Sequence, residues 1–223
     1  MTEPMVVPPE AQAADFRLNV VDIEDFNERV VGAYNNGTAD KGLEADFYLA
    51  RSIIPAGTAA LRDFSYIAPD IPEFLAENCV GCMDCVTECP DTAILGKAIE
   101  PENLEARLAG ITGDAERQKM SEQWSITNKY YTVLEKKGIG GGKFGIFIDP
   151  TKCKGCAECV DACGDHNALK MIRKDDHNLQ FYKDAFQFYK SLPETPKKFI
   201  NEKALSDMML TERSLLYVGG AGS

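Results

Sequence analysis

Eight cysteines offer the clearest chemistry in this sequence, and they fall into two short groups. The groups are Cys79, Cys82, Cys85 and Cys89, and Cys153, Cys156, Cys159 and Cys163. Both have the spacing C-x2-C-x2-C-x3-C. Three thiolates spaced by two residues on one curled loop can reach three corners of an iron–sulfur cubane, so the pattern predicts two [4Fe–4S] clusters.

The fourth cysteine of each motif is expected to serve the other cluster, as it does in two-cluster proteins with this motif. The predicted ligand sets are Cys79, Cys82, Cys85 and Cys163 for cluster one, and Cys153, Cys156, Cys159 and Cys89 for cluster two. We expect each fourth cysteine to begin a short helix that faces the neighbouring cluster. Gly81 and Gly155 precede the second cysteine of their motifs and fit a close approach of the backbone to a cluster.

Zinc and a cluster that has lost one iron are the alternatives for these cysteines. Zinc takes C-x2-C pairs that a longer loop separates, whereas four cysteines within eleven residues fit a cubane better. The second motif has Gly164 where the first has Pro90, and one more residue precedes its apolar pair. The loop there is expected to differ and to alter solvent access. His166 invites a ligand or proton-coupled role, but with four thiolates at hand we interpret it as a loop histidine, and His177 as a surface residue.

No catalytic residues are expected in this chain, because the sequence contains no Ser/His/Asp constellation. The segment Gly140–Gly145 has the letters of a G-x-G-x-x-G nucleotide loop, but a predicted strand follows it where a helix is required. Acidic residues outnumber basic ones 35 to 24, and the net charge of -11 makes nucleic acid an improbable partner. The sequence has neither a membrane-spanning run nor a signal peptide, which predicts a cytoplasmic protein.

The elements that would position the cysteines alternate between helix and strand. We expect strands at residues 16–21, 143–149 and 168–173, and helices at residues 22–34, 101–108, 114–124, 128–137, 178–191 and 197–210. Residues 1–15 are expected to form an extended arm. Prolines in residues 38–78 favour an extended connection to the first motif.

The flanks of the motifs resemble the ferredoxin domain of pyruvate:ferredoxin oxidoreductase and related 2-oxoacid oxidoreductases. The resemblance is carried by Gly57-Thr58-Ala59, by residues 67–74 and 89–94, by the strand Gly145–Asp149 before the second motif, and by a long insert between the motifs. Residues 215–223 resemble the approach to the thiamine-diphosphate domain of that family. The resemblance covers about residues 50–223, and the chain is then a separate subunit or a piece that stops before that domain.

The resemblance implies an α+β fold with a two-cluster bacterial ferredoxin-like core. The expected domains are an N-terminal arm and partner-contacting connector at residues 1–72, a ferredoxin domain at residues 73–174 with a helical insert at about 96–142, and a helical tail at residues 175–223. Thiamine diphosphate, magnesium and coenzyme A are expected on catalytic partner chains only. The implied function is transfer of single electrons between that catalytic site and external ferredoxin or flavodoxin. The alternatives are a free-standing carrier, the electron-input subunit of another redox complex, and a non-redox scaffold that the clusters staple.

Overall fold

The computed structural model describes residues 23–43 and 63–211 and divides the chain into two compact units, Met1–Leu61 and Arg62–Ser223. The expected arm, the strand at residues 16–21, the residues 57–59 and the segment 215–223 lie outside the described residues. In the first unit, the described part is helical. It comprises α2 (Ile23–Asp25), a π-helical stretch (Phe26–Val31), α3 (Gly32–Asn35) and α4 (Ala39–Gly42). The expected helix at residues 22–34 is therefore confirmed from Ile23 onward.

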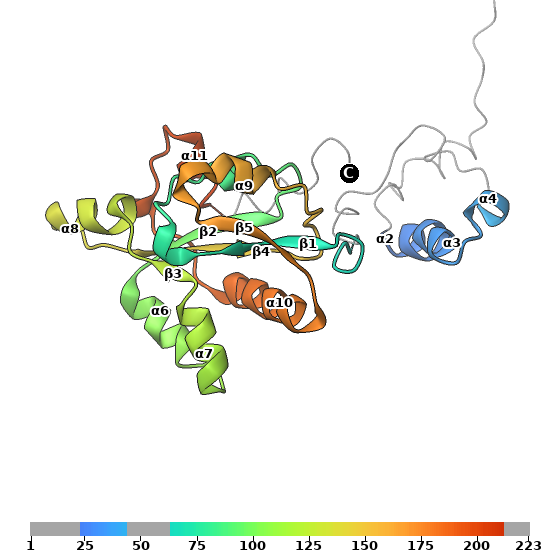
Figure 1. Ribbon diagram of the computed structural model, residues 1–223, viewed down its shortest axis with the longest axis horizontal. Coiled ribbons are helices and arrows are strands. Elements are labelled where there is room, and N and C mark those ends of the chain that lie inside the picture. The colour runs from blue at the N-terminus through green and yellow to red at the C-terminus, as the bar shows by residue number, and fades with distance from the viewer. Residues whose placement is uncertain (1–22, 44–62, 212–223) are drawn as a thin grey trace, which may run out of the picture. The chain divides into compact units, whose positions relative to one another are not determined.

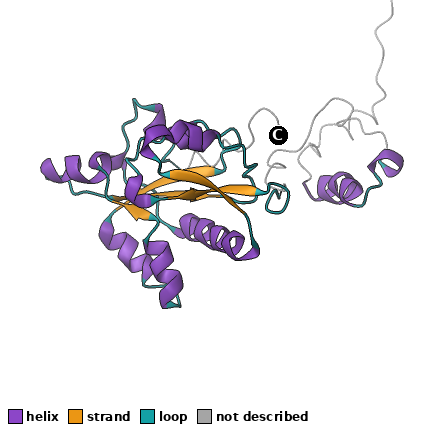
Figure 2. Cartoon of the chain, in the orientation of Figure 1, coloured by secondary structure: helices purple, strands orange, loops and turns teal. Residues whose placement is uncertain are grey.

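Two antiparallel sheets form the frame of the second unit (Figure 1). In one, β1 (Asp70–Phe74) pairs with β5 (Leu169–Arg173). In the other, β4 (Lys143–Ile148) lies between β2 (Ile94–Ile99) and β3 (Trp124–Ser125). Figure 2 shows these strands as a central layer with helices on both sides. The mixture of helices and sheets agrees with the expected α+β class.

The side chains of β4 alternate between two hydrophobic cores. Phe144, Ile146 and Ile148 pack with the cysteines in one core, and Phe147 packs in the other with residues of α10 (Asp176–Ser191). Because successive side chains of a strand point to opposite faces, burial on both faces explains the nearly continuous apolar sequence of β4. The fold thus reserves one face of this sheet for the cysteine motifs.

The strands β1 and β2 are not in the sequence-based expectation. The prolines of the connector predict an extended connection but no paired strand, and Pro72 lies within β1 opposite Met171. A proline is tolerated there because the sheet has only two strands, so each has an edge on which no N–H is required. Residues 96–99 complete β2, so the helices of the insert begin only at Pro101.

The insert contains α6 (Pro101–Leu108), α7 (Asp114–Ser121), a π-helical stretch (Asn128–Thr132) and α8 (Val133–Lys136). Three predicted helices are confirmed in position, but the second ends before Trp124. Trp124 instead pairs with Gly145 of β4 as part of β3. A strand also follows the glycine-rich segment Gly140–Gly142, as expected.

The tail packs on the frame rather than extending from it. The helix α10 begins with a capping box between Asp175 and Asn178 and lies against β4. The single helix expected at residues 197–210 is wrong, since a 3₁₀ turn (Lys197–Phe199) and α11 (Leu205–Met208) are separated by an irregular stretch. Asn201 explains the break, because its side-chain oxygen accepts from the Lys203 N–H and competes with helical bonding.

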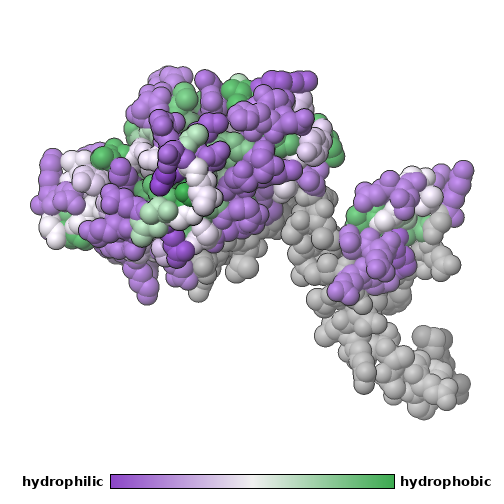
Figure 3. Space-filling model, turned by 90° about the horizontal axis from the view of Figure 1, so that it is seen from below, coloured by the Kyte–Doolittle hydropathy of each residue, from purple (hydrophilic) through white to green (hydrophobic). Residues whose placement is uncertain are grey.

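The surface seen in Figure 3 is mostly hydrophilic, with apolar side chains in small separate areas. Within the described residues, no helix has both the length and the apolar character that crossing a membrane requires.

Candidate metal centres

Each cysteine motif occupies a loop between a strand and a short helix. After β1, a 3₁₀ turn (Ala76–Asn78) leads to Cys79, and α5 (Asp84–Thr87) carries Cys85. After β4, a turn leads to Cys153, and α9 (Glu158–Cys163) carries Cys159 and Cys163. The expectation that the fourth cysteine begins a helix is wrong for Cys89, which follows α5, whereas Cys163 is the last residue of α9 and also the N-cap of a 3₁₀ turn (Gly164–His166). In the first motif the helix ends before the fourth cysteine, and in the second motif it ends at the fourth cysteine.

The first cavity brings together four cysteines from both motifs. They are Cys79, Cys82, Cys85 and Cys163. Apolar side chains complete the wall, including Phe74, Met83, Phe144 and Ile146. His166 lies at the same cavity but is exposed, whereas His177 is remote from it and lies 3.4 Å from the Lys119 amine.

The second cavity repeats this arrangement with the other four cysteines. It is lined by Cys153, Cys156, Cys159 and Cys89. Pro72, Pro90 and Ile148 contribute to its apolar wall. Each cavity is thus lined by three cysteines of one motif and by the fourth cysteine of the other.

The thiols also interact electrostatically within these sets. Cys79 interacts with Cys82 and Cys163, while Cys159 interacts with Cys153, Cys89 and Cys156. Burial raises the pKa of Cys79 to about 11 and that of Cys159 to about 12, and the neighbouring thiols contribute to both increases. All eight cysteines are free of disulfides. Such thiols ionise when a metal binds, because the positive charge of the metal offsets the desolvation.

The described residues contain no preassembled site for a single metal ion. In residues 23–43 and 63–211, no three His, Cys, Asp or Glu side chains converge on a point where one metal ion could be held. The thiols of each set instead surround a cavity.

The backbone of both loops adopts the same special conformation. Gly81 and Gly155 have φ of +75° and +68°, and two positions further on Met83 and Ala157 have φ of +75° and +67°. The positive values at Met83 and Ala157 have no signal in the sequence, since such residues rarely adopt them. The repeated geometry curls each loop, and the N–H groups of Gly81 and Gly155 lower the pKa of Cys79 and Cys153 against the larger effect of burial.

The fourth cysteines receive backbone hydrogen bonds from the residues that follow them. Ala93 donates to the Cys89 sulfur at 3.2 Å, and Ala168 donates to the Cys163 sulfur at 3.3 Å. The additional residue of the second motif is accommodated by a 3₁₀ turn (Gly164–His166) and by Asn167 at φ +51°. The loops differ as expected, but this contact to the sulfur is the same.

Tyr130 supports the first cysteine loop from the insert and was not anticipated from the sequence. Its ring stacks on Phe144 with centroids 4.9 Å apart, and a β-carbon at Gly81 would lie 3.0 Å from it. Its hydroxyl donates to the Asp207 carboxylate at 3.0 Å. Burial and the adjacent carboxylate raise the pKa of Tyr130 and keep the phenol protonated.

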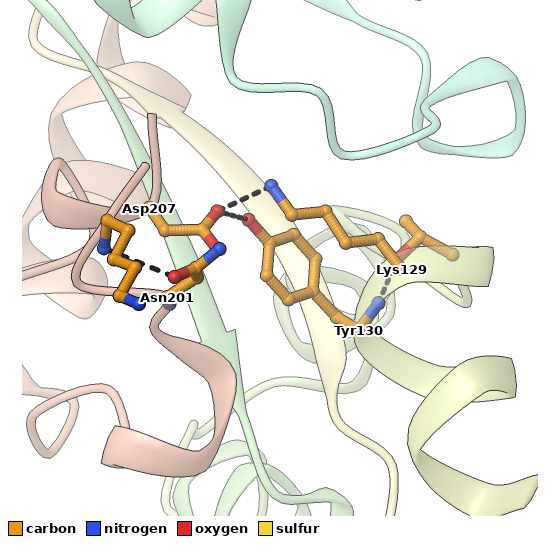
Figure 4. A network of polar contacts seen from close by, with 6 residues as sticks. Lys129, Tyr130, Asn201 and Asp207 are labelled. Atoms are coloured by element: carbon orange, nitrogen blue, oxygen red, sulfur yellow. Dashed lines mark hydrogen bonds and ion pairs between the residues drawn. The ribbon is translucent and has the colours of Figure 1, made fainter. Parts of the chain in front are cut away.

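Asp207 is buried and has three partners, shown in Figure 4. Besides Tyr130, Lys129 contacts the same carboxylate oxygen at 2.5 Å. The other oxygen accepts from the Asn201 N–H at 3.1 Å. This network therefore fastens the tail to the insert beside the first cavity.

Comparison with known proteins supports an iron–sulfur character for the first motif. Residues 71–94 match the family described as a 4Fe–4S binding domain.

The chain is 27% identical over 186 residues to the pyruvate:ferredoxin oxidoreductase of Moorella thermoacetica, and this alignment covers 81% of this chain and 14% of that protein. It is 26% identical over 177 residues to a probable pyruvate-flavodoxin oxidoreductase of Escherichia coli, covering 76% of this chain and 13% of that one. A pyruvate-flavodoxin oxidoreductase of Nostoc is 27% identical over 165 residues, with coverages of 71% and 12%. The chain thus spans about one seventh of the length of the relatives it matches.

Proposed function

We propose that this chain transfers single electrons through two [4Fe–4S] clusters, one in each cavity. The observation that carries the proposal is the distribution of the eight cysteines, four to a cavity, with Cys89 and Cys163 exchanged between the motifs. A cluster of this type, when bound, supplies one-electron redox chemistry at potentials that depend on charge, hydrogen bonds and solvent access.

The residues of the chain would hold and tune the two groups. Four thiolates would ligate each cluster, and the N–H groups of Ala93 and Ala168 donate to the sulfurs of Cys89 and Cys163. Apolar side chains exclude water from the walls. The two sites lie close together, because Cys85 of the first interacts electrostatically with Cys159 of the second. This proximity supports passage of an electron from one cluster to the other.

We further propose that the chain is the electron-transfer subunit or domain of a 2-oxoacid:ferredoxin oxidoreductase. The similarity to pyruvate:ferredoxin and pyruvate-flavodoxin oxidoreductases supports this assignment. Thiamine diphosphate with magnesium, together with coenzyme A, would bind on catalytic partner chains. Ferredoxin or flavodoxin would exchange electrons with the clusters. The insert and tail, which a small diffusing carrier does not need, support a docked subunit over a free-standing carrier.

Metal analysis tests the cluster proposal directly. Protein purified without oxygen is expected to contain about eight irons and eight acid-labile sulfides per chain, and dithionite should bleach its visible absorption. Stoichiometric zinc without labile sulfide would refute the proposal.

Reconstitution tests the place of the chain in the complex. The chain alone is expected to oxidise no 2-oxoacid, and to restore electron flow to ferredoxin when added to partners that carry the thiamine-diphosphate site. Decarboxylation of pyruvate or 2-oxoglutarate by the purified chain alone would contradict the assignment of catalysis to partners.

A further inference from the structure

Lys174 is held beside the second cysteine motif by contacts that involve both its backbone and its side chain. It directly follows β5, and its N–H donates to the Pro69 carbonyl at 2.9 Å. Its amine donates to the carbonyls of Phe64 at 3.3 Å and Ser65 at 3.2 Å. The position of the charged group is therefore fixed by the segment Phe64–Pro69.

This segment lies against the second cysteine loop. The Phe64 N–H donates to the Thr151 carbonyl at 2.7 Å, and Lys154 lies over the Phe64 ring. A β-carbon at Gly155 would come within 2.8 Å of the Asp70 carbonyl oxygen. The amine of Lys174 thus stands next to the loop that carries Cys153, and the two groups interact electrostatically.

The groups that act on the corresponding cysteine of the first motif are different. The partners that act on Cys79, the first cysteine of its motif, are the Gly81 N–H, Cys82, Cys163 and the hydroxyl of Ser125. None of them is a cation. The two sites therefore share their ligand type and loop geometry but differ in the charge beside their first cysteine.

Other charges near Lys174 reduce its effect without cancelling it. Asp63 and Asp70 both interact electrostatically with its amine. Asp70 pairs with Arg173 at 3.4 Å, and within the described residues neither carboxylate lies within ion-pair distance of Lys174. Burial lowers the pKa of Lys174, whereas Cys153 and the two carboxylates favour its charged form.

We infer that Lys174 raises the reduction potential of the cluster held by Cys153, Cys156, Cys159 and Cys89 above that of the other cluster. The inference rests on the proposed function, since it requires both clusters. Reduction adds one negative charge to a cluster, and a fixed ammonium group in a partly buried position stabilises that charge. The second cluster would then be reduced before the first. When the two clusters share a single electron, that electron would reside mainly on the second cluster.

An anaerobic potentiometric titration of the full chain, followed by electron paramagnetic resonance, tests this inference. Cys156→Ser, at an exposed ligand, serves to mark the spectrum of the second cluster. Lys174→Gln is expected to lower the ratio of reduced to oxidised second cluster about tenfold at a fixed potential. This change corresponds to a fall of about 59 mV in the reduction potential of a one-electron couple. Lys174→Arg should keep the ratio within about threefold, because it keeps the charge.

Lys170→Gln is the matched control, because it removes the same charge from an exposed position of β5 that pairs with Glu73. For both clusters, this substitution should leave the ratio of reduced to oxidised cluster within about threefold of its original value. Asp63→Asn provides a second test in the opposite direction. It removes a carboxylate beside Lys174 while keeping an acceptor for the Ser65 N–H, and should raise the ratio for the second cluster about threefold.

Equal shifts in Lys174→Gln and Lys170→Gln, or no selective shift in the second cluster, would overturn the inference. If Lys174→Gln does not bind both clusters, the absence of an upward shift in Asp63→Asn would overturn it. Failure of the unmodified chain to bind two clusters would instead refute the proposed function.

Discussion

The Tyr130 hydroxyl donates a hydrogen bond of 3.0 Å to the Asp207 carboxylate, and so joins two elements that are 77 residues apart in the sequence. The bond is buried and lies behind the first cysteine loop. Tyr130→Phe would keep the ring against Gly81 and Phe144 but remove one partner of a buried carboxylate. We expect it to lower the free energy of unfolding by about 1–3 kcal/mol, measured by urea denaturation of the cluster-loaded chain.

Tyr131→Phe is the control for this change. Tyr131 is adjacent in sequence and only half-buried, so its substitution should change the free energy of unfolding by less than about 0.5 kcal/mol. Equal stability of the two variants would contradict a structural role for the bond between Tyr130 and Asp207.

The two loop glycines should be required for cluster binding, each at its own site. Alanine at Gly155 would combine a φ of +68° with a contact of 2.8 Å to the Asp70 carbonyl oxygen, which cannot move freely because it belongs to β1. Gly81→Ala would press on the Tyr130 ring at 3.0 Å and should be milder. We expect Gly155→Ala to retain only about four irons per chain after reconstitution.

Gly138→Ala is the control that separates the effect of a positive φ from the effect of a steric clash. Gly138 has a φ of +70°, and nothing lies within 4 Å of the position that a β-carbon would take there, so alanine adds backbone strain without a clash. It should cost about 1 kcal/mol of stability and leave the iron content unchanged. Full iron binding by Gly155→Ala would show that the close approach to Asp70 is not essential.

If the fourth cysteines are exchanged, replacing the fourth cysteine of one motif should remove the cluster whose other ligands are in the other motif. Cys89→Ala should first remove the cluster whose other ligands are in the second motif, and Cys163→Ala should first remove the cluster of the first motif. Iron content and the resonance spectrum of the remaining cluster would distinguish the two losses. Cys156→Ala is the comparison for Cys89→Ala, since both line the second cavity. If Cys89→Ala instead resembled Cys82→Ala, the exchange would be wrong.

The clusters should be retained less well as the pH falls. Ligand thiols must lose their protons, and burial raises the pKa of Cys79 to about 11 and that of Cys159 to about 12. Protons therefore compete with iron for the ligand sulfurs at neutral pH, and this competition strengthens as the pH falls. It ends only when the pH is above these pKa values. Removal of iron by a chelator should be several-fold faster at about pH 6 than at about pH 8. A rate independent of pH, after correction for the affinity of the chelator, would argue against this competition.

The sequence by itself determined the cysteine motifs, their expected partition and most helices of the insert. These features depend on spacing within a few residues, where the choice of local conformations is small. The strands β1 and β2 escaped detection because Pro72 and the short apolar run at Ile94 acquire strand geometry only through pairing with β5 and β4. The helix expected at residues 197–210 failed because Asn201 and Asp207 satisfy backbone N–H groups in another way.

Tertiary structure alone decided which residues support the two cavities. Asp207 meets Tyr130, and Lys174 meets the carbonyls of Phe64 and Ser65, across separations of 77 to 110 residues. Nothing in the local sequence distinguishes these charged residues from the many others on an acidic chain. Their roles arise from burial and from the low local dielectric, which strengthen an interaction only after packing has brought the groups together.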